Sequence, residues 1–178
     1  MKHLKHYTII GIIFVLITGT LAHFLYDWTG NNHIVGLFTP ISESIWEHMK
    51  LLFFPMLTYS LIMILKFYSK YSCILSALCF GILVGTFLIP IFYYAYTSIL
   101  SKNIFILDIS IFVLSTVIAF WLSYKLTLSC RLESYTSLLC IMVCILFVCF
   151  LVFTYYHPNI AIFQDPTIMK TRWNRFLP

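Results

Sequence analysis

Long apolar segments alternate with short polar ones along most of this chain. Five segments stay apolar over about 20 residues, the length that a helix needs to cross the hydrocarbon core of a bilayer. They run over about 7–26, 45–65, 71–95, 104–124 and 135–156. The pattern predicts an all-α fold, a polytopic membrane helix bundle with five transmembrane helices. Since no polar block is long enough to fold alone, we expect a single integral membrane domain over 1–178.

Composition points the same way. The chain is 61% hydrophobic and 10% charged, whereas soluble domains are roughly 45–50% apolar and about 25% charged. We therefore expect the lipid bilayer as its surroundings. No Lys/Arg-rich run is present, so nucleic acid is not an expected partner. The first apolar segment is longer than the apolar part of a signal peptide, about 7–15 residues, and predicts a retained span.

Positive charges predict the orientation, because cytoplasmic loops carry an excess of Lys and Arg. One side collects Lys2, Lys5, Lys66, Lys70, Lys125 and Arg131, and the other only Lys50 and Lys102. The N-terminus is thus predicted inside and the C-terminus outside, with 157–178 as an extracytoplasmic tail. Lys170, Arg172 and Arg175 in that tail weaken the bias.

Most acids and histidines fall on the predicted outer side. They are Asp27, Glu43, Glu47, Asp108 and Asp165, with His23, His33, His48 and His157. Ionisable groups at membrane depth usually face the protein interior or water. We expect an outer polar layer whose candidate ligand-binding residues are His23, Asp27, Glu43, Glu47, His48 and Asp108. Trp46 is expected at the outer edge of the bilayer.

The stretch 42-SESIWEHMK-50 allows two interpretations. Glu43 and Glu47 are four residues apart, so on one helix they would share a face. They are either first-turn acids of a helix capped by Thr39 or Ser42, where acids suit the helix dipole, or the lining of a polar pocket.

The other candidates leave similar alternatives open. His23 and Asp27 share a helix face and make either a metal-ligating pair or a structural hydrogen bond. Asp108 lies just inside an apolar span and should have a partner, although a first-turn acid also suits the helix dipole. His33 and His157 are expected to be solvated. Asp165, in 163-FQDP-166, is expected in a turn.

Small residues and cysteines predict structural features only. Gly81 and Gly85 form GxxxG, which favours a close helix contact. The six cysteines lie in or beside apolar segments without a CxxC motif. We expect them to be buried as small apolar side chains, without a disulfide or a cysteine-bound zinc.

No catalytic motif such as HExxH or GxSxG occurs, so catalytic residues are unknown and an enzyme is not the favoured hypothesis. The leading hypothesis is a membrane protein with an outward-facing acidic and histidine site for a cation or small polar ligand, as a homo-oligomer or with a membrane partner. A divalent metal would use His23, Asp27, Glu47 and His48. The alternatives are a metal-dependent membrane hydrolase, which adds Asp108, and a purely structural membrane component.

The residues also resemble a known family. The stretch 23-HFLYDWTGNNHIVGLFTPISESIWEHMKLLFFP-55, with 81-GILVGTFLIPIFYYAYTSIL-100, 107-LDISIF-112 and 163-FQDP-166, is similar to the uncharacterised bacterial integral membrane family DUF6512. The resemblance implies a small multi-pass protein of the bacterial plasma membrane and carries over no catalytic residues. His157 stands where the family pattern has proline, and FQDP continues as TIMKTRW without the Thr-Gly and Tyr-Gly elements of that pattern. His157 is therefore a weaker candidate ligand.

Overall fold

The structure is a computed structural model that describes residues 2–165. Its elements are α1 (Lys2–Trp28), α2 (His33–Phe38), α3 (Ile45–Phe67), α4 (Ile74–Leu100), α5 (Phe105–Ser129), the 3-10 turn η1 (Glu133–Tyr135), α6 (Thr136–Phe153) and the 3-10 turn η2 (Ala161–Phe163). The basic tail residues Lys170, Arg172 and Arg175 lie outside the described part. All elements are helical over residues 2–165, as predicted.

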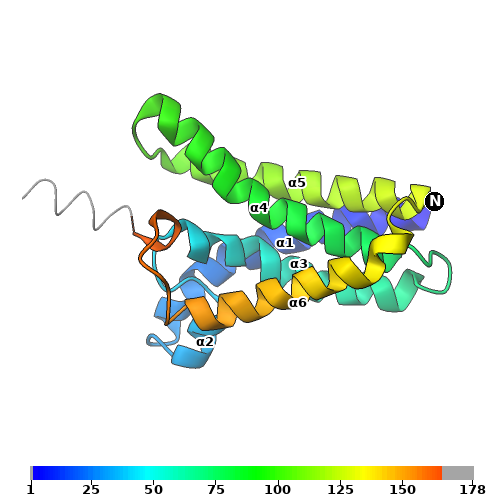
Figure 1. The fold of residues 1–178 in the computed structure, drawn as a ribbon, viewed down its shortest axis with the longest axis horizontal. Coiled ribbons are helices and arrows are strands. Elements are labelled where there is room, and N and C mark those ends of the chain that lie inside the picture. The colour runs from blue at the N-terminus through cyan, green and yellow to red at the C-terminus, as the bar shows by residue number, and fades with distance from the viewer. Residues whose placement is uncertain (1, 166–178) are drawn as a thin grey trace, which may run out of the picture.

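Five of these helices, α1, α3, α4, α5 and α6, are long and apolar enough to cross a membrane. Consecutive long helices run in opposite directions along the bundle (Figure 1). This confirms an all-α protein with five candidate spans. The side of the membrane that each terminus faces stays a prediction.

Helix α4 lies between α3, α5 and α6, and α1 packs on α3 and α5. The contact between α4 and α5 is close because two glycines of α4 face small residues of α5. A Cβ added to Gly81 would overlap Ser123 Oγ, and one added to Gly85 would lie 2.6 Å from Ala119 Cβ. The close contact predicted from GxxxG is confirmed, and it sets the distance between these helices.

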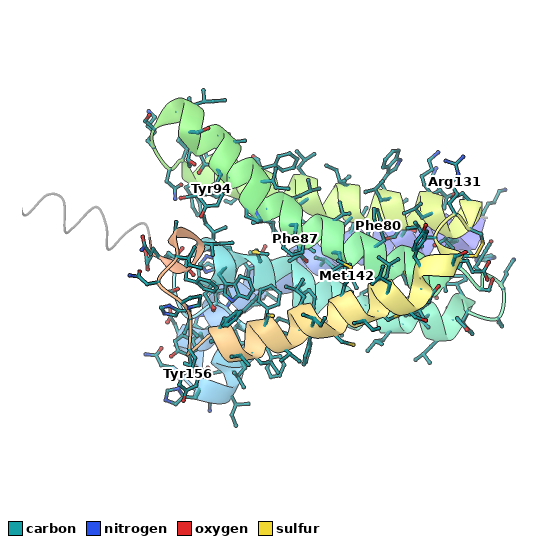
Figure 2. The ribbon with its side chains drawn as sticks, viewed as in Figure 1. Phe80, Phe87, Tyr94, Arg131, Met142 and Tyr156 are labelled. Atoms are coloured by element: carbon teal, nitrogen blue, oxygen red, sulfur yellow. A yellow bond between two sulfur atoms is a disulfide. The ribbon has the colours of Figure 1, made fainter. Side chains whose placement is uncertain are left out.

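Large apolar side chains cover the outside of the bundle. Phe87 and Tyr94 of α4 and Met142 of α6, labelled in Figure 2, are exposed examples. Exposed apolar patches of this extent are unusual on a soluble monomer. They suit contact with lipid, whose tails are as apolar as the side chains.

The two ends of the bundle carry different charges. One end, here called the acidic end, holds Asp27, Glu43, Glu47, Asp108 and Asp165; the other, the basic end, holds Lys2, Lys5, Lys66, Lys70, Lys125 and Arg131 (Figure 1). The acidic end is built from the C-terminus of α1, all of α2, the N-terminus of α3, the α4–α5 turn and the segment after α6. The grouping expected from the sequence is present among the described residues.

Helix α3 begins at Ile45, where the predicted span begins, but its cap is not one of the expected residues. Its N-cap is Ser44, whose hydroxyl accepts the backbone N–H of Glu47 at 3.4 Å. The expectation that Thr39 or Ser42 caps α3 is therefore wrong. Thr39 instead ends α2, a helix that was not predicted from the sequence. Asn32 starts α2 by accepting the Ile34 N–H at 2.9 Å, so an ordinary Asx cap nucleates a turn inside an apparent loop.

Trp46, at the start of α3, is buried inside the bundle. Its ring packs against Phe150 at 4.7 Å and Phe163 at 4.9 Å between ring centroids. The ring of Trp46 is covered by α6 and the segment around η2, so it does not face headgroups. The depth of Trp46 in the bilayer stays a prediction.

The expectation that the cysteines form no disulfide is also wrong. Cys73 and Cys130 are joined by a disulfide, with their Cα atoms 5.2 Å apart. They are 57 residues apart in sequence, and only the antiparallel packing of α4 on α5 brings the start of one helix beside the end of the other. Sequence spacing carries no sign of that proximity.

Candidate cation site at the acidic end

Three ionisable side chains converge at the acidic end: His23 near the end of α1, Glu43 in the turn before α3, and His48 in the first turn of α3. Glu43 Oε2 lies 3.4 Å from His48 Nε2 and 3.9 Å from His23 Nε2. The ligating atoms of all three residues lie within 4.8 Å of one another. We call these three residues the His–Glu cluster.

The orientation of the His48 ring follows from its second nitrogen. Nδ1 lies 2.9 Å from the carbonyl oxygen of Ser44. Because a carbonyl oxygen only accepts hydrogen bonds, Nδ1 carries a proton. A neutral His48 then presents the lone pair of Nε2 to the carboxylate of Glu43, and a backbone carbonyl on the far nitrogen is the usual support of a metal-binding histidine.

The cluster is partly open. The side chains of His23, Glu43 and His48 are 30%, 50% and 28% exposed. When Nε2 is also protonated, His48 hydrogen-bonds the carboxylate of Glu43, and this bond holds the pKa of Glu43 below its usual value despite partial burial. The acid is therefore ionised at neutral pH and reachable from solvent.

The segment after α6 supports the cluster. Asp165 Oδ2 accepts the backbone N–H of Glu43 at 3.3 Å. This bond spans 122 residues and ties the turn that carries Glu43 to the end of the described chain. The position of Glu43 thus depends on contacts from three segments: α1, the start of α3 and the segment around η2.

Glu47 lies in a separate contact, here called the Glu47–Lys50 pair. Lys50 Nζ lies 2.7 Å from Glu47 Oε2. The lysine side chain is 0% exposed and the glutamate side chain 4% exposed. Lys50 also donates to Thr154 Oγ1 at 2.6 Å and to the Gly36 carbonyl at 3.1 Å, with the Thr39 carbonyl at 3.5 Å. Three strong acceptors match its three N–H groups, so the charge is buried with its partners complete.

Asp108 is held in a third place, at the turn between α4 and α5. The hydroxyl of Tyr96 donates to Asp108 Oδ1 at 2.5 Å. Asp108 lies in the first turn of α5, as expected, and its expected partner is a tyrosine of the neighbouring helix. No hydrogen bond or ion pair is found between Asp108 and the His–Glu cluster within residues 2–165.

The remaining candidates lie around these three places. Asp27 is exposed on the last turns of α1. His33 and His157 are exposed and lie against Tyr155 and Phe163. Asp165 hydrogen-bonds Glu43, as described above. In the described chain these residues share the acidic end with the cluster without adding a ligand atom to it.

The six predicted site residues are thus divided. His23, Glu43 and His48 come together, Glu47 pairs with Lys50, Asp108 bonds Tyr96, and Asp27 stands apart. The metal set expected from sequence named Glu47 where the geometry offers Glu43. The signal that distinguishes them is Ser44: a residue before an N-cap leaves the helical phase, so Glu43 is free to turn toward α1.

The comparison with known protein families agrees with the resemblance noted in the sequence. The model of DUF6512, a family of unknown function, matches residues 1–171. The chain belongs to this family. No curated protein and no solved structure matches it. This DUF6512 protein is a multi-pass membrane protein by helix length and hydropathy.

Proposed function

We propose that this DUF6512 protein binds a divalent transition-metal cation through His23, Glu43 and His48. Two imidazoles and one carboxylate are ligands that zinc and related metals accept, and three protein ligands leave a position for water or a small ligand. The 3.4 Å between Glu43 Oε2 and His48 Nε2 matches the separation of about 3.4 Å expected for two ligands at about 2.1 Å from a tetrahedral ion.

The observation that carries the proposal is the contact between Nε2 of His48 and the Glu43 carboxylate. With Nδ1 committed to the Ser44 carbonyl, two lone pairs face each other unless a cation lies between them. A proton or a metal ion satisfies that requirement. Competition between the two makes metal binding weaker at acid pH, because metal ligands must be deprotonated.

The positions of the positive charges support an extracytoplasmic position of the His–Glu cluster. The basic end carries the short loops rich in Lys and Arg, which favours a cytoplasmic position. Under this orientation the N-terminus is inside, the C-terminal segment is outside, and the His–Glu cluster faces the extracytoplasmic side of a bacterial plasma membrane. The bound cation would come from outside the cell.

Binding is favoured over hydrolysis because of the positions of two acids. The hydrolase hypothesis needs a free carboxylate beside the metal as general base. Glu47 is engaged by Lys50 and Asp108 by Tyr96. In the purely structural hypothesis, Glu43 would simply tie α1 to α3, and that hypothesis gives a different result in the experiment below.

The test is metal titration of the purified protein in detergent, with the disulfide oxidised, followed by thermal unfolding and elemental analysis. We expect Zn²⁺ to raise the unfolding temperature of the wild type and to be retained at about one ion per chain. His48→Ala should abolish both effects. His6→Ala, an exposed histidine at the basic end, is the matched control and should keep them.

Two results would overturn the proposal. One is a wild type that retains no metal and shows no stabilisation by Zn²⁺, Mn²⁺, Ni²⁺ or Co²⁺. The other is that His48→Ala lowers the unfolding temperature while added metal changes the unfolding temperature of neither the wild type nor the variant. That result is expected of a purely structural contact.

A further inference from the structure

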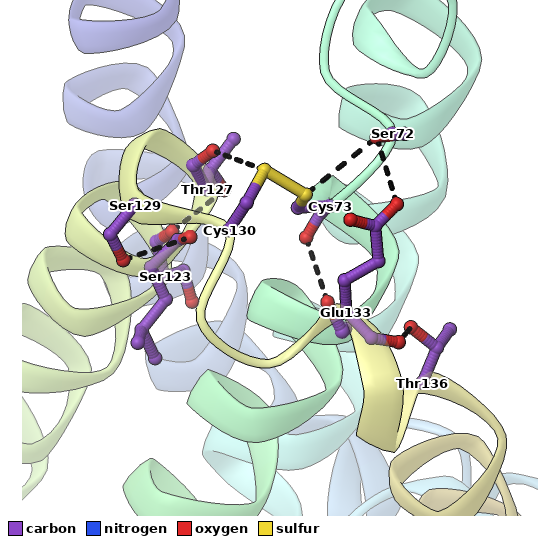
Figure 3. The surroundings of a disulfide bond; sticks show 10 residues. Ser72, Cys73, Ser123, Thr127, Ser129, Cys130, Glu133 and Thr136 are labelled. Atoms are coloured by element: carbon purple, nitrogen blue, oxygen red, sulfur yellow. Dashed lines mark hydrogen bonds between the residues drawn. A yellow bond between two sulfur atoms is a disulfide. The ribbon is translucent and has the colours of Figure 1, made fainter.

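The basic end holds a second group of ligand-type side chains, far from the His–Glu cluster. Cys73 precedes α4, Cys130 follows α5, and Glu133 begins η1 (Figure 3). The ligating atoms of these three residues lie within 4.8 Å of one another. Glu133 N–H also donates to the Cys130 carbonyl at 3.4 Å, so the backbone fixes the acid beside the disulfide.

Ser72 connects the acid to the sulfur atoms. Its hydroxyl donates to Glu133 Oε1 at 3.2 Å and lies 3.6 Å from Cys73 Sγ (Figure 3). Cys73 is buried, whereas Cys130 and Glu133 are exposed. One face of the disulfide is therefore open to solvent and the other rests on the bundle.

We propose that, when the disulfide is reduced, Cys73, Cys130 and Glu133 form a binding site for Zn²⁺ or another thiophilic divalent cation. Two thiolates and one carboxylate are zinc ligands, and they leave an open fourth position. Zn–S distances of about 2.3 Å require the sulfur atoms to move to roughly 3.8 Å from each other. Exposed Cys130, at the end of α5, is the side free to move.

The surrounding charge favours the thiolate form. Arg131 follows Cys130 directly in the chain, and the ends of α3 and α5 that carry Lys66 and Lys125, with the turn that carries Lys70, belong to the same end of the bundle. Nearby positive charge stabilises thiolates, which are both the nucleophiles of exchange and the metal ligands. If the basic end is cytoplasmic, as proposed above, thiols there are normally kept reduced.

The chemical step requires a dithiol reductant. A thiolate of the reductant attacks the exposed Sγ of Cys130, the S–S bond breaks, and the Cys73 thiolate leaves. The second thiol of the reductant then attacks the mixed disulfide and releases the Cys130 thiolate. The reductant becomes a disulfide, two electrons pass to the protein sulfurs, and Zn²⁺ takes the place of the two protons released to solvent. The metal then replaces the covalent link between the ends of α4 and α5.

Cobalt is a suitable probe, because Co²⁺ bound to thiolates gives a near-ultraviolet charge-transfer absorption that histidine and carboxylate ligands do not give. The full chain in detergent would be compared oxidised and after dithiothreitol treatment and desalting under argon. We expect thiol titration under denaturing conditions to find the four free cysteines in the oxidised protein and all six after reduction. The charge-transfer absorption should appear only in the reduced protein, at about one cobalt per chain, and excess Zn²⁺ should remove it.

Variants locate the site. Cys130→Ser should lose the absorption, and Glu133→Gln should weaken cobalt binding about 10-fold or more, since one ligand is lost. Cys144→Ser, an exposed cysteine of α6, should behave as the wild type. The proposal is overturned if fully reduced wild type shows no thiolate absorption, or if the Cys144→Ser change removes it while Cys130→Ser does not. Failure of the His–Glu cluster would leave this signal unchanged.

Discussion

Two carboxylates four residues apart, Glu43 and Glu47, have opposite surroundings. Glu43 is half-exposed beside two histidines, and Glu47 is buried against Lys50. The difference arises at Ser44, the N-cap of α3. Glu47 follows the cap and is carried by the helix toward α2 and α6, whereas Glu43 precedes it and turns toward α1.

The contrast teaches which acid is available for binding. Lys50 has three close acceptors, and Glu47 Oε2 also accepts the Ile41 N–H at 3.0 Å. In such a pair the acid is already neutralised by the lysine and gains little from a further cation. The His–Glu cluster is incomplete without a proton or metal. Charged residues in or beside a membrane helix are thus not equally good candidates for binding. A residue whose hydrogen bonds are already satisfied by the protein is a poorer candidate than one that still lacks a partner.

The largest effect is expected from the Glu47–Lys50 pair. Glu47→Gln leaves the lysine charge buried without its counter-ion, and breaking a buried pair in this way costs about 3–5 kcal/mol of unfolding free energy. Unfolding in mixed detergent micelles measures the loss. Lys102→Ala, at an exposed lysine of the same end, is the control and should change little.

The double variant Glu47→Leu/Lys50→Met sharpens this test. Because both charges disappear together, most of the lost stability should return. A Glu47→Gln protein of normal stability that has lost metal affinity would reverse the roles assigned to the two acids.

A smaller effect, on binding instead of stability, is expected at Glu43. Glu43→Gln should weaken Zn²⁺ binding at least about 100-fold, or about 2.7 kcal/mol, since loss of an outer-shell partner alone costs about 10–100-fold. Calorimetric titration measures the change. Asp27→Asn alters an exposed acid of α1 and should leave affinity unchanged; equal losses in both variants would point to a general charge effect.

A third test concerns the support of Glu43 by Asp165. Asp165→Ala removes the acceptor of the Glu43 N–H. We expect about 1 kcal/mol of lost stability and about a 10-fold loss of metal affinity, as for other partners that orient a ligand. Asp165→Asn keeps an acceptor oxygen and should restore most of the affinity. Asn and Ala variants that lose equal affinity would show that charge, and not position, matters.

The smallest effect is the pH dependence of stability due to Glu43. Its pKa is lowered in the folded protein, chiefly by the hydrogen bond from His48. The contribution is therefore present above the ordinary glutamate pKa of about 4.3 and is lost as pH falls through the lower, folded-state value. Since the side chain is half-exposed, the contribution should not exceed about 1 kcal/mol.

Unfolding of wild type and Glu43→Gln in metal-free buffer across the acid range measures this term. The difference between the two proteins should shrink as pH falls through the folded-state pKa of Glu43 and vanish at low pH. A difference that grows on acidification would mean that the carboxylate is destabilised in the fold.

Much of the fold follows from hydropathy alone. The five spans were predicted because each needs about 20 apolar residues regardless of its neighbours, and the acidic and basic ends follow from alternating helix direction. Helix α2, the burial of Trp46 and the Cys73–Cys130 link were missed. Each depends on which segments meet in space, and that information is absent from local sequence.

The site was predicted only in part, because local sequence gives the depth of a residue on its helix but not its neighbours in space. His23 and His48 were chosen from their depth on two helices, and the structure brings them to one carboxylate. The metal set predicted from the sequence named Glu47, whereas the structure brings Glu43 to the histidines, because the Ser44 cap lies between the two acids and separates their directions. The orientation of the termini, the membrane involved and any homo-oligomer or membrane partner stay predictions.

The partners of Lys50 bear on the order in which the chain is assembled. Glu47, Gly36 and Thr39 lie close to the lysine in sequence, but Thr154 is 104 residues away, at the end of α6. During synthesis, α3 must enter the membrane well before Thr154 leaves the ribosome. The lysine then has an open donor until the last helix is inserted. We expect premature termination before α6 to leave a chain with this charge incompletely satisfied, and such a chain should be a preferred target of membrane quality-control proteases.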